Sequence, residues 1–120
     1  MKQLIWFLPA IAVFLGILLL STVFSAPVQV DGANVSDKLL HAFAYSVFLL
    51  TVGFGLIQSK LYTLKRMLIC SLLIIAYGTS LEWVQYTFFP DRYFEWQDAL
   101  ANTVGVVTGQ LLIIVYRAVF

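Results

Sequence analysis

The chain has 120 residues, of which 62% are hydrophobic and only 11% are charged, whereas soluble domains carry about 25% charged residues. The formal net charge of +1 excludes a basic surface large enough for nucleic acid. A single cysteine, Cys70, excludes an internal disulfide and a zinc site built from cysteines. The composition therefore predicts a single domain, residues 1–120, that lipid surrounds.

Four apolar stretches follow one another along the chain, at about residues 4–26, 38–58, 67–89 and 98–117. Each is close to the roughly 20 residues that a helix needs to cross about 30 Å of hydrocarbon. Backbone groups in lipid must bond within the protein, so helices are expected. The first stretch exceeds the roughly 7–15 apolar residues of a signal peptide, and we interpret it as a retained anchor helix. The sequence thus predicts an all-α, four-helix transmembrane bundle with short loops.

The charged residues between the apolar stretches predict how the bundle is oriented. Lys38 and Arg92 fall on one side of the membrane, together with most of the acidic residues. The other basic residues fall on the opposite side, with no acidic residue among them: Lys2, Lys60, Lys65, Arg66 and Arg117. Because cytoplasmic loops carry an excess of Lys and Arg, both termini are expected in the cytoplasm.

Most polar side chains of the predicted spans lie at one depth, near the outer face of the membrane. They open the second and fourth helices and close the third, and most of them step by three or four residues, which places them on one helix face. With Arg92 in the loop before the fourth helix, the candidate site residues are Asp37, Lys38, His41, Glu82, Gln85, Asp98 and Asn102.

Two of the predicted helices begin in this polar layer, so their free N–H groups and positive dipole ends face it. Together with Lys38 and Arg92, these helix starts form a candidate anion site. The carboxylates of Asp37 and Asp98 would repel a bare anion. They favour a ligand that brings a cation or many hydrogen-bond donors. Carboxylates with amide oxygens suit a hard divalent cation such as Mg²⁺.

Glu82 is the most informative residue of the layer. It lies about 10 Å inside the outer end of an upright third helix. A lone carboxylate at such a depth costs on the order of 2.5–3.5 kcal/mol. Glu82 is therefore expected to be protonated, paired or facing a wet cavity, and His41 is its expected partner.

Each residue of the layer also has a purely structural interpretation. Asp37 and Asp98 are good N-caps, Asn102 can join two helices by a hydrogen bond, and Arg92 can tie down a turn. His41 alone would more often be a hydrogen-bonded structural residue than a catalyst. The common depth of polar groups on three helices favours a site.

Small residues recur at every fourth position of the fourth helix, at Ala101, Gly105 and Gly109. Such a stripe lets a neighbouring backbone approach closely. We expect it to pack within the bundle, and a homodimer through Gly105 and Gly109 is the alternative.

The polar residues also form an ordered set of motifs over about residues 36–110. This set resembles the VanZ-like family of small bacterial membrane proteins, through Asp37-Lys38-x-x-His41, Glu82-x-x-Gln85, Arg92, Asp98 and Ala101-Asn102-Thr103-x-Gly105. The resemblance implies a bacterial cell-envelope protein in the cytoplasmic membrane. It also implies a link to resistance against the glycopeptide teicoplanin, and it dictates no reaction.

Two functions remain open from the sequence. The first is a ligand-binding or catalytic site at the outer leaflet for an anionic, lipid-linked or phosphate-bearing envelope precursor. In a catalytic version, His41 would be the general acid or base and Glu82 would tune it. The second is a non-enzymatic membrane scaffold whose polar layer only stabilises the bundle. A transporter is less expected, because the inner halves of the helices are almost wholly apolar.

Overall fold

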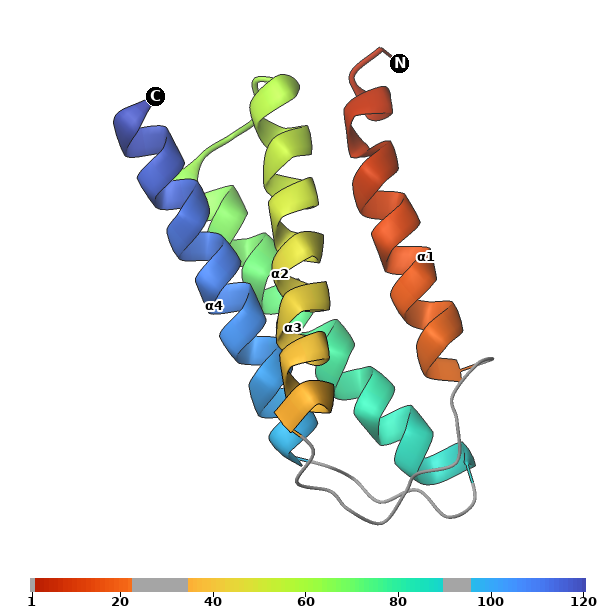
Figure 1. The fold of residues 1–120 in the computed structure, drawn as a ribbon. Helices are drawn as coiled ribbons and strands as arrows, with labels where there is room; N and C mark the ends of the chain where they lie inside the picture. Colours follow the sequence, from red (N-terminus) through yellow and green to blue (C-terminus); the bar gives the residue numbers. More distant parts are fainter. Residues whose placement is uncertain (1, 23–34, 90–95) are drawn as a thin grey trace.

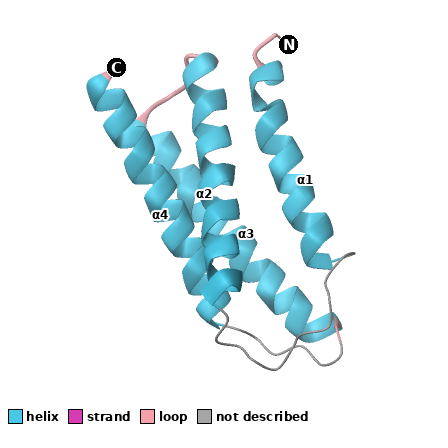
Figure 2. Ribbon diagram, in the orientation of Figure 1, coloured by secondary structure: helices cyan, strands magenta, loops and turns pink. Residues whose placement is uncertain are grey.

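The computed structural model describes residues 2–22, 35–89 and 96–120 (Figure 1). Within these ranges the chain is helical and contains no strand (Figure 2). A short 3₁₀ turn, η1 (Leu4–Phe7), leads into the first of four helices, which are α1 (Leu8–Thr22), α2 (Val35–Gln58), α3 (Leu64–Phe88) and α4 (Trp96–Val119). The predicted all-α, four-helix fold is therefore confirmed.

All four helices have the length and composition of membrane spans. Each is at least 18 residues long and apolar enough to cross a bilayer, counting η1 with α1. Large apolar side chains point away from the bundle on every helix, for example Leu20, Leu40, Leu72 and Leu111. Exposed apolar surface of this extent is incompatible with water and is what lipid requires. The chain is therefore a multi-pass membrane protein by its fold.

Two ends of the bundle differ in charge. Both termini lie at one end of the bundle, together with the connection between α2 and α3 (Figure 1). The basic residues Lys60, Lys65, Arg66 and Arg117 belong to this end, whereas Lys38 lies at the opposite end, near the start of α2. This is the separation of charge that the sequence predicts between the two sides.

The connection between α2 and α3 is a tight turn whose hydrogen bonds explain where α2 ends and where α3 begins. Lys60 N donates to Ile57 O and Leu61 N donates to Leu56 O, at 3.0 and 2.8 Å. This pattern is a Schellman motif, which requires a left-handed residue, and Lys60 supplies it with φ of 59°. The Thr63 side chain then accepts from Arg66 N at 3.1 Å and caps α3. Helix α3 thus begins at Leu64, three residues before the predicted start.

Helices α2 and α4 form the central pair of the bundle. Gly105 packs against the backbone carbonyl of Ala42, and a Cβ added at Gly109 would lie 3.1 Å from Ser46 O. The small residues of α4 therefore face α2 within the same chain. Leu49, Met67 and Val106 fill the centre of the bundle and are almost completely buried.

Helix α1 covers one side of this core. The Phe14 ring stacks on the Tyr77 ring with centroids 4.8 Å apart, and the Tyr77 hydroxyl donates to Phe14 O at 3.0 Å. In η1, just before α1, the ring of Trp6 meets that of Phe54 edge to face, with centroids 6.0 Å apart. Few residues of α1 are buried, as expected for a helix that has one face on the bundle and the rest in lipid.

Candidate functional site

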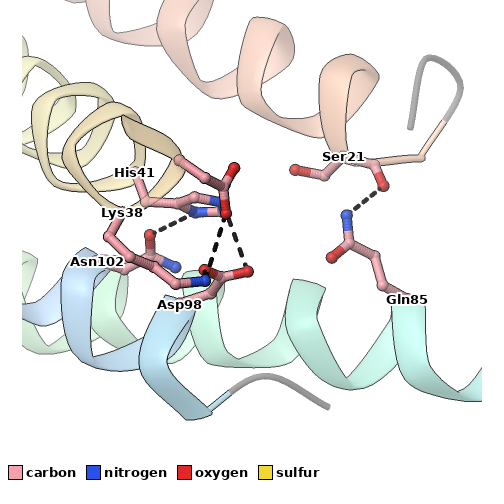
Figure 3. A network of polar contacts seen from close by, with 7 residues as sticks. Ser21, Lys38, His41, Gln85, Asp98 and Asn102 are labelled. Carbon is pink, nitrogen blue, oxygen red and sulfur yellow. Dashed lines mark hydrogen bonds and ion pairs between the residues drawn. The ribbon is translucent and has the colours of Figure 1, made fainter. Parts of the chain in front are cut away.

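The starts of α2 and α4 lie side by side and bring five of the predicted site residues together (Figure 3). Lys38 Nζ forms an ion pair with Asp98 Oδ1 across the two helices and lies 3.4 Å from Asp37 Oδ2. His41 Nδ1 lies 3.0 Å from Asn102 Oδ1. We call Asp37, Lys38, His41, Asp98 and Asn102 the polar cluster. It joins α2 to α4 through the contacts of Lys38 with Asp98 and of His41 with Asn102 and Asp98.

The polar cluster has a buried floor and an open side. Asn102 is only 2% exposed and Asp98 is 7% exposed, both on α4. On α2, the side chain of Asp37 is 45% exposed, and those of Lys38 and His41 are partly exposed. A ligand would therefore approach from the α2 side, next to Asp37, and meet the charges on α4 deeper in the protein.

The hydrogen bond to Asn102 determines how His41 faces the two carboxylates. An amide oxygen can only accept a hydrogen bond, so Nδ1 of His41 carries a proton and donates to Asn102 Oδ1. The other ring nitrogen, Nε2, lies 3.7 Å from Asp98 Oδ2 and 3.8 Å from Asp37 Oδ1. A bare lone pair on Nε2 would be repelled by both oxygens. A cation bound between the three side chains would remove this repulsion.

The same three side chains have the arrangement of a cation site. Asp37, His41 and Asp98 each offer one ligand atom, and these atoms lie within 4.8 Å of one another. Asn102 would hold the imidazole in the tautomer that leaves Nε2 for a metal, which is how outer partners orient histidine ligands. The ammonium of Lys38 competes for the same carboxylate of Asp98. The sequence predicted the two carboxylates as cation ligands, and the geometry adds His41.

Glu82 is buried on α3, as the apolar sequence around it predicts. It lies one helical turn after Gly78, on the same face. A Cβ at Gly78 would lie 2.8 Å from the Tyr45 ring and 3.0 Å from Asn102 Nδ2. Glu82 therefore belongs to the face of α3 that packs toward Tyr45 and Asn102. Its expected pairing with His41 stays a prediction.

Gln85 and Arg92 lie apart from the polar cluster for different reasons. Gln85 is buried on α3, and its Nε2 donates to Ser21 O of α1 at 2.7 Å (Figure 3). In this position Gln85 fastens α1 to α3 and lies away from the cluster residues that are labelled in Figure 3. Arg92, the predicted basic residue of the last loop, lies outside the described residues.

One buried polar pair was missed in the sequence. Ser71 Oγ donates to Gln110 Oε1 at 2.8 Å, in the half of the bundle that the sequence predicted to be almost wholly apolar. Within the described ranges, Gln110 Nε2 is buried without a hydrogen-bond partner. The sequence contained a signal for Gln110, because it continues the four-residue steps that begin at Asp98 and Asn102 and pass through Val106. The structure shows that all four residues are buried.

Comparison of the chain with protein-family models, with curated proteins and with solved structures found no match.

Proposed function

We propose that this chain is a multi-pass protein of the bacterial cytoplasmic membrane, similar to VanZ-like proteins, with both termini in the cytoplasm. Its polar cluster binds an anionic, phosphate-bearing precursor of the cell envelope near the outer leaflet. The observation that supports this proposal is the meeting of Lys38 and His41 on α2 with Asp98 and Asn102 on α4. Two helix starts that each present polar side chains to the same point are suited to an anionic group.

The charges of the polar cluster restrict how an anion can bind. Lys38 lies against both Asp37 and Asp98, so one ammonium serves two carboxylates. A bare phosphate would therefore meet two carboxylates and a single ammonium. A divalent cation held by Asp37, His41 and Asp98 would reverse the sign of the cluster and bridge it to phosphate oxygens. We propose that the ligand binds together with such a cation.

The proposal has an enzymatic version. There, the cation is held by Asp37 and Asp98 alone, so that Nε2 of His41 is left to act as the general acid or base while Asn102 holds its Nδ1. Glu82 acts on His41 from α3. Teicoplanin resistance in a bacterial host is the cellular function that the family resemblance favours.

A structural scaffold is the second candidate, and one observation favours it. The contacts within the cluster already satisfy the charges of Lys38 and Asp98 and hold α2 against α4. In this version the polar layer is an internal clamp between helices and takes no ligand. Ion pairs and amides can lock transmembrane helices in this way.

A binding experiment separates the two functions. Purified full-length protein in nanodiscs is titrated with farnesyl diphosphate, with and without Mg²⁺, and the melting temperature is followed. We expect Mg²⁺-dependent stabilisation of the wild type and, in Asp37→Asn, a loss of affinity of about ten-fold or more at an unchanged melting temperature without ligand. Asp37 is the best choice because it is the most exposed carboxylate of the cluster.

Ser80→Ala is the matched control, since Ser80 is exposed on α3 and bonds only its own helix, at Ala76 O. It should bind as the wild type does. The proposal is wrong if the wild type gains no stability from the diphosphate. If, in addition, Asp98→Asn lowers the melting temperature, the scaffold function is supported.

A further inference from the structure

A groove lies between α2 and α4 at the end of the bundle opposite the polar cluster. Its volume is about 360 Å³, within the range of small-ligand sites. The helices meet at Gly105 and Ala42 near the cluster and separate toward their other ends (Figure 1). Apolar side chains dominate the lining, which consists of Leu50, Phe54, Ile57, Gln58, Leu112, Ile113 and Tyr116.

The outer rim of this groove is polar, and a basic residue follows one of its members in the chain. Gln58, the last residue of α2, is exposed there, and Tyr116 lies opposite it on α4. Arg117 follows Tyr116, and its guanidinium carbon lies 5.1 Å from the centre of the Tyr62 ring. This stacking on an aromatic face holds a cation beside the mouth of the groove.

The whole end of the bundle around the groove is basic. Lys60, Lys65 and Arg66 are exposed in the turn between α2 and α3 and in the first turn of α3. The acidic residues of the described ranges are Asp37, Glu82 and Asp98, and all belong to the half of the bundle that holds the polar cluster. The rim therefore complements an anion that also carries an apolar tail.

We propose that this groove binds one acyl chain of an anionic phospholipid from the leaflet at the end where both termini lie, with Arg117 and Gln58 at its phosphate. The apolar walls suit a hydrocarbon chain, and the basic rim suits the head group. A second copy of the chain fits less well, because a two-fold contact at this groove would bring the same basic side chains together. The inference rests on the membrane spans and is independent of the ligand of the polar cluster.

Trp6 offers a reporter beside this site and is itself 40% exposed. Its ring lies 6.0 Å from that of Phe54, which lines the groove. Trp83 and Trp96 are exposed toward lipid, so Trp83→Phe with Trp96→Phe leaves Trp6 as the single tryptophan without disturbing the core. Acyl chains that carry bromine quench tryptophan fluorescence on contact. The full-length variant is reconstituted in phosphatidylcholine vesicles that contain a small fraction of brominated phosphatidylglycerol or brominated phosphatidylcholine.

We expect brominated phosphatidylglycerol to quench Trp6 more strongly than brominated phosphatidylcholine at the same mole fraction. Arg117→Gln should lower this preference roughly five-fold, the factor that one basic side chain contributes near an anionic lipid. Lys65→Gln is the control: it removes the same charge at the same end of the bundle, from the first turn of α3, whereas Arg117 directly follows the groove residue Tyr116. It should keep most of the preference, and circular dichroism checks that both variants are folded.

Three results would overturn the inference. Equal quenching by the two lipids would mean that the groove meets ordinary boundary lipid. If Arg117→Gln and Lys65→Gln lowered the preference for phosphatidylglycerol equally, the preference would come from the general positive charge of this end of the bundle and not from a site at the groove. Absence of quenching by either lipid, with a dimer found by light scattering, would assign the groove to a second copy.

Discussion

Gly105 packs against the backbone carbonyl of Ala42 so closely that a Cβ at this position would overlap it. Ala42 directly follows His41, and Gly105 lies about one turn after Asn102. The close approach of the two backbones is therefore adjacent to the hydrogen bond between His41 and Asn102. A glycine on α4 determines the spacing at which the polar cluster can form.

We expect Gly105→Ala to lower the free energy of unfolding by about 1–3 kcal/mol, because the new methyl group must push two backbones apart. Denaturant unfolding of the purified protein in detergent measures this change. Gly16→Ala is the control, since a Cβ at Gly16 meets nothing within 4 Å and alanine favours the helix. Equal stability of the two variants would contradict the close contact between α2 and α4.

Lys60 occupies a left-handed position that favours glycine. We expect Lys60→Gly to raise the free energy of unfolding by about 1 kcal/mol, because glycine adopts this conformation without steric cost. Lys65→Gly should do the opposite by about the same amount, since Lys65 lies in the first turn of α3. The same unfolding measurement reads both changes, and a loss of stability in Lys60→Gly would show that the lysine side chain itself supports the turn.

The buried pair of Ser71 and Gln110 leaves one amide nitrogen of Gln110 without a partner among the described residues. An unsatisfied buried polar group costs about 1–3 kcal/mol. The double variant Ser71→Ala with Gln110→Leu should therefore be as stable as the wild type or more stable, as judged by its melting temperature. A large drop in melting temperature would indicate that Gln110 Nε2 is satisfied in the membrane, for instance by a buried water.

Glu82→Gln tests the polar layer in cells, under the proposed function. It keeps the shape of the side chain and replaces the carboxyl group by an amide that cannot ionise, so resistance to teicoplanin should vanish in a susceptible host while the amount of folded protein is unchanged. Ser71→Ala, a buried polar change elsewhere on α3, should keep the resistance. If resistance and folded protein fall together in Glu82→Gln, the layer is a scaffold. If the wild type confers no resistance, the likeness to VanZ-like proteins does not extend to this function.

The fold and most of the polar cluster could be predicted because hydrocarbon penalises polar groups strongly. Four long apolar stretches had one possible secondary structure, and the four-residue steps from Asp37 to His41 and from Asp98 to Asn102 placed these side chains on facing stripes. The direction of Gln85 could not be predicted in the same way. Its face of α3 borders both the cluster and α1. The carbonyl of Ser21 can accept from Gln85 only after α1 has packed against α3, and the sequence does not show this packing.

The predicted start of α3 is three residues too late because the prediction excludes the charged residues Lys65 and Arg66 from the helix. Lys65 and Arg66 lie within its first turn, and the cap formed by Thr63 outweighs their polarity. Long basic side chains at the end of a span can reach the interface while their backbone stays helical. The uncharged apolar stretch therefore begins later than the helix that contains it.

The polar cluster is divided between α2 and α4, which are separated along the chain by all of α3. During synthesis, Lys38 and His41 leave the ribosome well before Asp98 and Asn102 exist. Until α4 enters the bilayer, α2 carries these groups without their partners across the helix interface, at a cost that hydrocarbon imposes on each. Completion of the last described helix thus supplies these partners, and a chain cut before α4 would lack the contacts of Lys38 with Asp98 and of His41 with Asn102.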